Sequence, residues 1–553
     1  MKNNVKYLSC LLALILALSC LTSCKLWSMT MDYLKDVTEE ESSESYKEQT
    51  AYGMAYDLTD ADKAAFEKAL DTCLSLIQSG AETSVIDLSV EKIESLFYRI
   101  SDQADLAYIL FCMDQEDAVA SENYLYASEM KSDVYADYMK MCQKIDASSY
   151  PYRDRFFEDW SESDFLEMRQ YTDEVSAINK VNDEILVSYR ELDPESDSFA
   201  ADVCRLYASM VQNNQNLASL FGYADYVSYA YDVVYERDYT QQELTALRTY
   251  VQTYLVPLCK TAYDIFLEGY QSLNTADQFL LSSWIYDDYD DFTGDPVGAY
   301  LSSLPTEMGQ VMKKALQSEY AVFTNDQNAY EGAFTGYFYG NSYPVCYFGP
   351  GYQSVFTVIH EAGHFYAADC QGGLDIDLDL AELHSQGNEW LMTVYSKNLM
   401  SAELYEVMCA YKLFESLGTI IIGVIIDEFE EMVYTNATSL LGNVEQLDGF
   451  MAEVCARYGG EEFLSNYVTD MSLYWKYVVI ESPVYYISYS ISAISALTLY
   501  SEAIKDYEGA LEIYQSLAAG ELIEDAFLAN LEQAGLASPF DEKVYQAISK
   551  LIQ

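Results

Sequence analysis

The stretch VFTVIHEAGHFYAAD, residues 355–369, holds two of the three histidines in this chain of 553 residues. Its apolar residues recur at helical spacing, so we expect a helix that begins near Ser354 and ends before Gly372. His360 and His364 are four positions apart and therefore share one face of that helix. Two imidazoles on one helix face can reach the same metal ion.

Glu361 lies between these histidines and completes the pattern HExxH. A carboxylate at this place can take a proton from a water at the metal without being a ligand itself. Gly363 leaves out a side chain where a second segment of backbone can come close. The alternative is that two core histidines fell into this spacing by chance, a rare coincidence in a chain with three histidines. The pattern favours a metal centre.

A catalytic zinc takes three protein ligands and keeps one position open, so a third ligand is needed. The segment DLDLAELHSQGNEWLM, residues 377–392, offers Glu382 and Glu389, which are seven positions apart and lie on one helix face. Either glutamate could ligate. His384 lies two positions from Glu382 and so points elsewhere on a helix; it is either a group near the ligands or substrate, or a solvent or core histidine.

The segment GAFTGYFYGNSYPVCYFGPG, residues 332–351, departs from the helical pattern because it is dense in Gly and Tyr. It predicts two short strands that turn at GNS. Pro344 predicts that the second strand, Tyr343 to Phe348, lies at a sheet edge, where it could bind an extended peptide through backbone hydrogen bonds.

Helical spacing dominates the rest of the chain. A helix is expected between a cap at Thr59 and a stop at Gly80. The apolar runs at residues 418–426 and 490–500 are too short to span a bilayer and are typical of buried helices. The sequence therefore predicts a mainly α protein.

The net charge of −59 argues against nucleic acid and anionic membrane surfaces as partners, since both require clustered Lys and Arg. The acidity indicates either a solvated surface or an acidic cavity that favours cationic peptides. Beyond Cys24, nine cysteines are scattered without a CxxC pair, which argues against a disulfide framework or a thiolate zinc site.

The motif HEAGH followed by AELHSQGNE is similar to the zinc site of the oligoendopeptidase F and thimet oligopeptidase family, zinc metallopeptidases of the HExxH gluzincin type. The resemblance includes residues 221–258, 336–349 and 481–497, and covers the chain from about residue 200 to its end. It implies that Glu382 is the third ligand of one Zn²⁺ per chain, and that Glu389 supports the ligands. The fold it implies is a large helical two-lobed body with a deep channel and a small sheet next to the HExxH helix.

The resemblance also implies a metalloendopeptidase that hydrolyses short peptides by attack of a water that Glu361 activates at the zinc. A hydroxyl donor opposite the zinc would stabilise the carbonyl oxygen as it gains charge. The resemblance favours Tyr489 for this task, with Tyr486 or Tyr485 beside it, and aromatic packing is the alternative for each. Val478 stands where the family carries a histidine, so the alternative function is a catalytically impaired, peptide-binding surface lipoprotein.

The N-terminus is typical of an export signal, because Lys2 and Lys6 precede a short apolar run. That run ends in LTSC, which resembles a bacterial lipoprotein box and would make Cys24 a lipidated first residue; an ordinary secretory signal is the alternative. We expect a monomer anchored on the extracellular face of the bacterial cytoplasmic membrane. The expected parts are a signal peptide (1–23), an acidic tether (24–55), an N-terminal helical lobe (56–200) and a zinc metallopeptidase domain (201–553).

Overall fold

The computed structural model describes residues 50–551 apart from 148–152, 154–156, 158–164, 166–167, 170–172, 191, 195, 293, 375–376, 437–442, 466–469 and 524–525. The predicted signal peptide, Cys24 and the tether as far as residue 49 lie outside the described residues.

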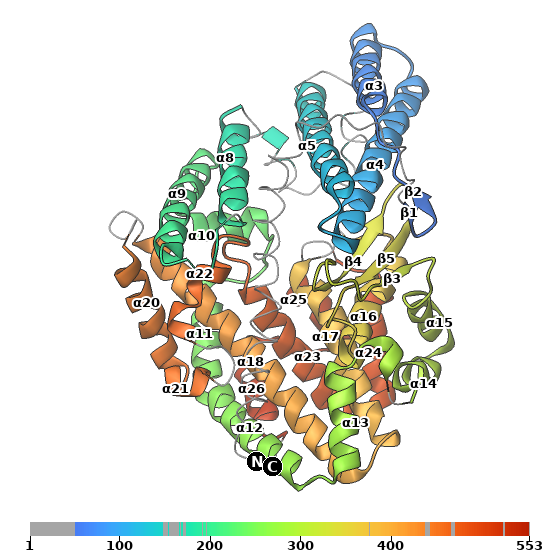
Figure 1. Ribbon diagram of the computed structural model, residues 1–553. Helices are drawn as coiled ribbons and strands as arrows, with labels where there is room; N and C mark the ends of the chain where they lie inside the picture. Colours follow the sequence, from blue (N-terminus) through green and yellow to red (C-terminus); the bar gives the residue numbers. More distant parts are fainter. Residues whose placement is uncertain are drawn as a thin grey trace.

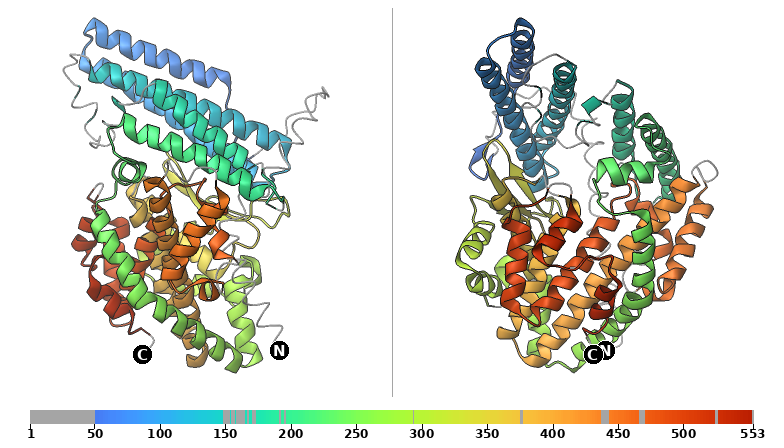
Figure 2. Two further views of the ribbon diagram at one scale, coloured as in Figure 1. Left: turned by 90° about the vertical axis from the view of Figure 1, so that its left-hand side faces the viewer. Right: turned by 180° about the vertical axis from the view of Figure 1, so that it is seen from behind.

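Three long helices form the N-terminal lobe, which stands above one side of the larger body (Figures 1 and 2): α3 (Asp60–Ser79), α4 (Thr83–Met113) and α5 (Ala118–Asp146). They pack around an apolar core of their own. The predicted helix is confirmed as α3, which begins after Thr59 and ends at Gly80 in the left-handed conformation.

A short hairpin, β1 (Thr50–Ala51) and β2 (Met54–Ala55), precedes α3. The buried hydroxyl of Tyr52 donates a hydrogen bond to the carbonyl oxygen of Cys346 (2.8 Å). Folded structure is therefore present at Thr50, five residues before the expected end of the tether at residue 55.

The larger body is mainly helical, with α8 and α9 above its second side (Figure 1). Its α-helices are α8 (Asp173–Arg190), α9 (Phe199–Leu220), α10 (Tyr226–Tyr229), α11 (Gln241–Tyr250), α12 (Val256–Ser272), α13 (Thr275–Tyr286), α14 (Pro296–Ser303), α15 (Thr306–Lys314), α16 (Val355–Gln371), α17 (Leu378–Tyr395), α18 (Ala402–Thr435), α20 (Val444–Arg457), α21 (Glu461–Leu464), α22 (Trp475–Val478), α23 (Ile487–Ala503), α24 (Tyr507–Ala519), α25 (Phe527–Ala534) and α26 (Glu542–Ile548). Short π-helical or 3₁₀ turns are η1 (Ala230–Val234), η2 (Val251–Leu255), η3 (Tyr289–Asp291), η4 (Ser396–Asn398) and η5 (Met471–Leu473). The mainly α, two-lobed body expected from the sequence is confirmed.

The expected boundary at residues 200/201 falls inside α9. Packing divides the chain earlier, because the core of α3–α5 reaches Met168 and the core of the larger body begins at Val175.

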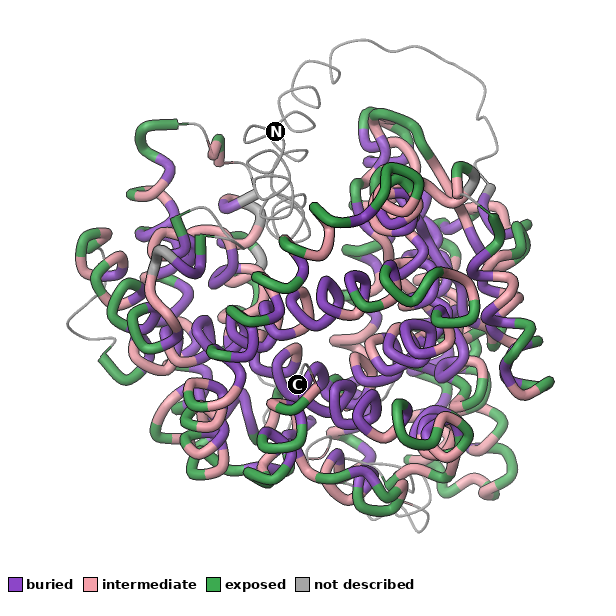
Figure 3. Tube along the Cα trace, turned by 90° about the horizontal axis from the view of Figure 1, so that it is seen from below, coloured by how far each residue is buried: buried purple, intermediate pink, exposed green. Residues whose placement is uncertain are grey.

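The two apolar runs form the interior of the larger body, as predicted. Residues 418–426 belong to α18 and residues 490–500 to α23, and these helices pack against each other. Within the described part of the chain, α18 alone is long and apolar enough to cross a membrane, but 72% of its most apolar window is buried in the protein. Figure 3 shows the buried stretches gathered inside and the exposed stretches on the outside.

The small sheet has three strands in the order β3–β5–β4: β3 (Ala321–Phe323), β5 (Tyr343–Phe348) and β4 (Ala333–Phe338). It lies beside α16, as expected from the sequence. The two predicted strands are β4 and β5, which pair antiparallel over their full length.

The prediction that Tyr343–Phe348 lies at the sheet edge is wrong, because β5 is the central strand. The N–H of Cys346 donates to the carbonyl oxygen of Tyr320 (2.8 Å), on the side of β3. Pro344, two residues earlier, faces that same side, but β3 pairs with β5 only from Cys346 onwards. The missing N–H of Pro344 therefore costs no ladder bond, and β4 is an edge of this sheet.

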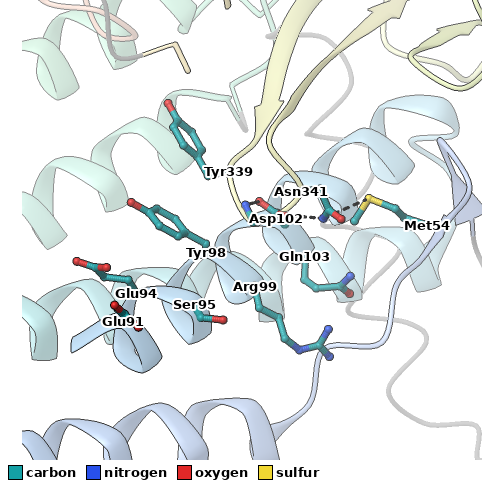
Figure 4. A pocket seen from close by; sticks show the side chains of 11 residues that line it. Met54, Glu91, Glu94, Ser95, Tyr98, Arg99, Asp102, Gln103, Tyr339 and Asn341 are labelled. Carbon is teal, nitrogen blue, oxygen red and sulfur yellow. Dashed lines mark hydrogen bonds between the residues drawn. The ribbon is translucent and has the colours of Figure 1, made fainter. Parts of the chain in front are cut away.

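The turn between β4 and β5 attaches the sheet to the N-terminal lobe (Figure 4). The buried carboxylate of Asp102 on α4 accepts hydrogen bonds from the Gly340 N–H (3.1 Å) and the Asn341 side chain (2.8 Å). Beside this contact is a cavity of about 420 Å³, whose lining includes the stacked rings of Tyr98 and Tyr339. The cavity shares no residue with the HExxH helix.

The helices α16 and α17 come into backbone contact at Gly363. A Cβ atom there would lie 2.6 Å from the carbonyl oxygen of His384 and 2.9 Å from the Cα of Ser385. The expected close approach at this glycine is confirmed.

Replacing Gly363 with Ala is predicted to lower the free energy of unfolding by about 1–3 kcal/mol, because both colliding atoms belong to rigid backbone. Denaturant titration measures this. Gly449→Ala on α20 is the matched control, since nothing lies within 4 Å of its added methyl group, and it is expected to keep or slightly raise stability. Equal stability of the Gly363 variant and the wild type would contradict the close contact.

Candidate metal centre

The predicted HExxH helix is α16. It begins after Ser354, whose side chain accepts a hydrogen bond from the Thr357 N–H, and ends at Gly372 in the left-handed conformation. His360 and His364 are partly exposed and Glu361 is buried.

The structure brings His360 and His364 together with Glu382 on α17. One donor atom from each residue lies within 4.8 Å of the others. The Nε2 of His360 is 3.8 Å from a carboxylate oxygen of Glu382. Two imidazole nitrogens and one carboxylate oxygen form a donor set that suits a divalent metal and leaves a coordination position open. Of the two glutamates that spacing left open, Glu382 is the one that faces both histidines.

Glu389 binds the other nitrogen of His360, with 2.7 Å between Nδ1 and the Glu389 carboxylate oxygen. This bond fixes the ring and leaves Nε2 free to face the metal position. The ammonium group of Lys412 on α18 binds the second oxygen of Glu389 (2.6 Å) and also binds Glu415. Lys412 is only 4% exposed. Lys412 was not identified from the sequence, although it is the only basic residue of a long helix that carries several carboxylates, a signal that could have identified it.

The charges of Lys412 and His360 favour the ionised form of Glu389. Burial raises its pKa, but the charge of Lys412 and the bond from His360 lower it to about 2. Burial lowers the pKa of His360, while the bond and charge of Glu389 raise it to about 9 in the metal-free protein. Burial and the charge of His360 hold the pKa of His364 well below its usual value, so His364 is a neutral donor.

Glu361 is 4% exposed and lies against β4, where the hydroxyl of Thr335 donates a hydrogen bond to one carboxylate oxygen (2.7 Å). Burial raises its pKa to about 7, against the lowering effects of His360 and Thr335. A carboxyl group with a pKa near neutrality can both take and return a proton. Thr335 was not identified from the sequence, because no local pattern links a strand threonine to a helix 26 residues later.

His384 belongs to the protein interior. Its Nε2 lies 3.0 Å from the carbonyl oxygen of Leu517 on α24, and its own carbonyl oxygen accepts a hydrogen bond from Tyr514. Of the two interpretations that the sequence left open, the structure favours a core histidine.

The three tyrosines cluster at the start of α23, which packs against α17. The ring of Tyr489 lies 5.1 Å from that of Tyr485 and 5.8 Å from that of Tyr486. Burial raises the pKa of Tyr485, and the charge of Glu382 raises it further, which places Tyr485 within electrostatic reach of the metal group. Tyr485 of the tyrosine cluster therefore feels the charge of the candidate ligand Glu382.

Val478 is 1% exposed and packs in the core of the larger body from α22. Its position supplies no polar group to the site.

Replacing Glu389 with Gln is predicted to weaken zinc binding roughly tenfold to a hundredfold, because the charged acceptor that orients His360 is lost. Titration against a competing chelator measures this. Glu415→Gln is the control: it removes the other carboxylate bound to Lys412 and leaves the His360 contact intact. Equal zinc affinity in the Glu389 variant and the wild type would refute the supporting role of Glu389.

No family profile and no curated protein match this sequence. Solved structures do match. PZ peptidase A, solved with an inhibitor, has a TM-score of 0.67 at 16% identity, over 92% of this chain and 98% of its own. A chain assigned as an oligoendopeptidase F has a TM-score of 0.67 at 17% identity, over 92% of this chain and 97% of its own. Oligoendopeptidase-F from Enterococcus faecium has a TM-score of 0.56 at 13% identity, over 89% and 96%. The chain shares the fold of these peptidases.

Proposed function

We propose that this protein is a zinc-dependent metalloendopeptidase that hydrolyses short peptides. The observation that carries the proposal is the placement of Glu361. It is buried, bonded to Thr335, and lies between two histidines whose donor atoms converge with Glu382. The shared fold with oligoendopeptidases agrees with this assignment.

His360, His364 and Glu382 would hold one zinc ion, which polarises the peptide carbonyl and acidifies a water when it is bound. Glu361 takes the proton of the attacking water and passes it to the leaving amine. The hydrogen bond from Thr335 fixes one oxygen of Glu361 and leaves the other for the proton. Tyr489, with Tyr485 or Tyr486 beside it, donates a hydrogen bond to the carbonyl oxygen as it gains charge.

The peptide would lie along β4. This strand is a sheet edge, and it carries Thr335 next to Glu361. Backbone pairing with an edge strand is nearly blind to side chains, so we expect broad sequence specificity. From the sequence we expected a peptide to bind along β5 as an edge strand. Because β5 is the central strand, we propose that the peptide binds along the edge strand β4 instead.

The proposal includes the location of the protein. A signal peptide of residues 1–23 and a lipid on Cys24 would hold a monomer on the extracellular face of the bacterial cytoplasmic membrane. Short extracellular peptides would then be its substrates.

A peptide-binding protein that no longer cleaves is the second candidate. Val478 favours it, because an apolar core residue occupies the place of the family histidine. Retention of Glu361 with all three candidate ligands favours the enzyme.

The deciding experiment measures turnover of a library of quenched peptides of roughly six to fifteen residues, a length that an extended strand can hold. We expect cleavage by the zinc-loaded wild type and a loss of at least about a hundredfold in Glu361→Gln, because the general base is gone. Zinc content, which should be one per chain in both, is the control. Absence of cleavage by both proteins at one bound zinc would exclude the peptidase and support the peptide-binding candidate.

Replacing Tyr489 with Phe is predicted to lower kcat by roughly a hundredfold to a thousandfold with little change in KM, because its hydroxyl acts on the transition state. The same substitution at Tyr485 and at Tyr486 shows which hydroxyl contributes most. Tyr500→Phe is the matched control, because Tyr500 is a buried tyrosine of the same helix whose ring packs against Trp390. If Tyr489→Phe retains wild-type kcat, Tyr489 is not the donor.

A further inference from the structure

The turn that carries the tyrosines has a strained backbone at Val484. Its φ angle is +64°, in the left-handed region that β-branched residues avoid. The residue is 1% exposed. A conformation of this kind costs free energy and persists only where neighbouring groups hold it.

Glu430 on α18 holds this residue. Both of its carboxyl oxygens accept the N–H of Val484, at 3.1 and 3.0 Å. Glu430 is completely buried, and a buried carboxyl group is expensive unless it is hydrogen-bonded. The buried carboxyl group of Glu430 therefore offsets its own cost of burial through the hydrogen bonds that it accepts from the strained residue Val484.

Two residues that follow η1 bind the same turn on either side of Val484. The hydroxyl of Tyr235 donates to the carbonyl oxygen of Pro483 (2.8 Å). The guanidinium of Arg237 donates to the carbonyl oxygen of Tyr485 (3.3 Å) and to the hydroxyl of Ser488 (3.0 Å). We call Tyr235, Arg237 and Glu430 the turn clamp.

The turn clamp is itself closely packed. The guanidinium of Arg237 lies 4.3 Å from the ring centroid of Tyr231 and 4.4 Å from that of Tyr235. On the other side, α18 approaches the turn at Gly423, where a Cβ atom would lie 2.6 Å from the carbonyl oxygen of Tyr486. Ser490 adds a hydrogen bond to the carbonyl oxygen of Ile420 (2.9 Å).

The turn decides where the tyrosines lie. Tyr485 directly follows Val484, feels the charge of Glu382 and contacts Tyr489. The metal group is carried by α16 and α17, so the position of Tyr485 relative to the metal group depends on this turn, while the position of Tyr489 depends also on the packing of α23 against α17.

We propose that the turn clamp positions the tyrosines for the reaction: Glu430 holds Val484 in the left-handed conformation and thereby fixes Tyr485 and Tyr489 beside the metal group. This inference rests on the proposed peptidase function. Glu430, Tyr235 and Arg237 are positioning residues, because each acts through the turn.

The first test compares two substitutions at Glu430. Glu430→Met fills similar space without an acceptor, and we expect kcat per bound zinc to fall roughly tenfold to a hundredfold, with KM and zinc affinity unchanged. Glu430→Gln keeps an oxygen that accepts the Val484 N–H, so it should stay within about twofold of wild type. Glu428→Gln is the control on the same helix; its carboxylate binds Tyr458 and Arg457 at the end of α20 rather than the turn, so the change should leave kcat unchanged.

The second test removes the strain. In the Glu430→Met background, Val484→Gly should recover at least about threefold of the lost kcat, because glycine adopts positive φ without steric cost. Val484→Ala removes nearly as much side chain but keeps the strain, and should recover nothing. Hydrogen exchange over residues 481–490 should be faster in Glu430→Met and slower again only with glycine.

The outcomes separate the two proposals. The role of the turn clamp is overturned if the wild type cleaves peptides and Glu430→Met has the same kcat. It is also overturned if Val484→Gly and Val484→Ala restore kcat equally in the Glu430→Met background. Absence of wild-type turnover overturns the proposed function, and the exchange pattern then decides whether Glu430 holds the turn.

If Glu430→Met does not fold, Tyr235→Phe replaces it in the test. Loss of the hydroxyl bound to Pro483 should lower kcat without changing zinc affinity, and an unchanged kcat overturns the proposal.

Discussion

The contact between α16 and α17 is the constraint on which the site depends. The two helices can touch because Gly363 has no side chain where the backbone of His384 and Ser385 passes. A second contact joins the two helices, because the buried side-chain amide of Asn388 on α17 donates a hydrogen bond to the carbonyl oxygen of Ile359 on α16 (2.7 Å). The hydroxyl of Tyr300 donates a hydrogen bond to the same amide and fixes its orientation. The candidate ligands come from both helices, so a small increase in this spacing would separate the histidines from Glu382.

The long apolar helix α18 contributes polar groups to both halves of the site. From α18, Lys412 reaches Glu389 and through it His360, while Glu430 reaches Val484 and through it the tyrosine turn. Each polar group is buried at a cost that only its specific partner offsets. The apolar surroundings keep both contacts dry and therefore strong. The same composition that resembles a membrane span by length and hydropathy thus forms the rigid support of a polar site.

The sheet shows how tertiary context overrides a sound local rule. Proline avoids central strands because it has no N–H to donate. Pro344 is tolerated in the central strand β5 because the neighbouring strand β3 is too short to reach it, so no partner there requires an N–H. The exposed edge therefore moves to β4, the strand whose Thr335 touches Glu361, and so the correction also changes where a peptide would lie.

Features that depend on local spacing could be predicted from the sequence. The positions of His360, Glu361 and His364 on one helix face, the helix ends at Thr59, Gly80 and Gly372, and the buried character of α18 and α23 all follow from periodicity and capping, which act over a few residues. Spacing also placed Glu382 and Glu389 on a common helix face, but it could not show which of them is the third metal ligand. Long-range contacts were needed to show that Glu382 faces the histidines and that Glu389 binds His360. The same holds for the bonds of Lys412 to Glu389, of Thr335 to Glu361 and of Glu430 to Val484. These contacts join residues that are 18 (His364 and Glu382) to 54 (Glu430 and Val484) positions apart in the chain. They form only when apolar packing brings separate helices and strands together, a result that no local pattern encodes.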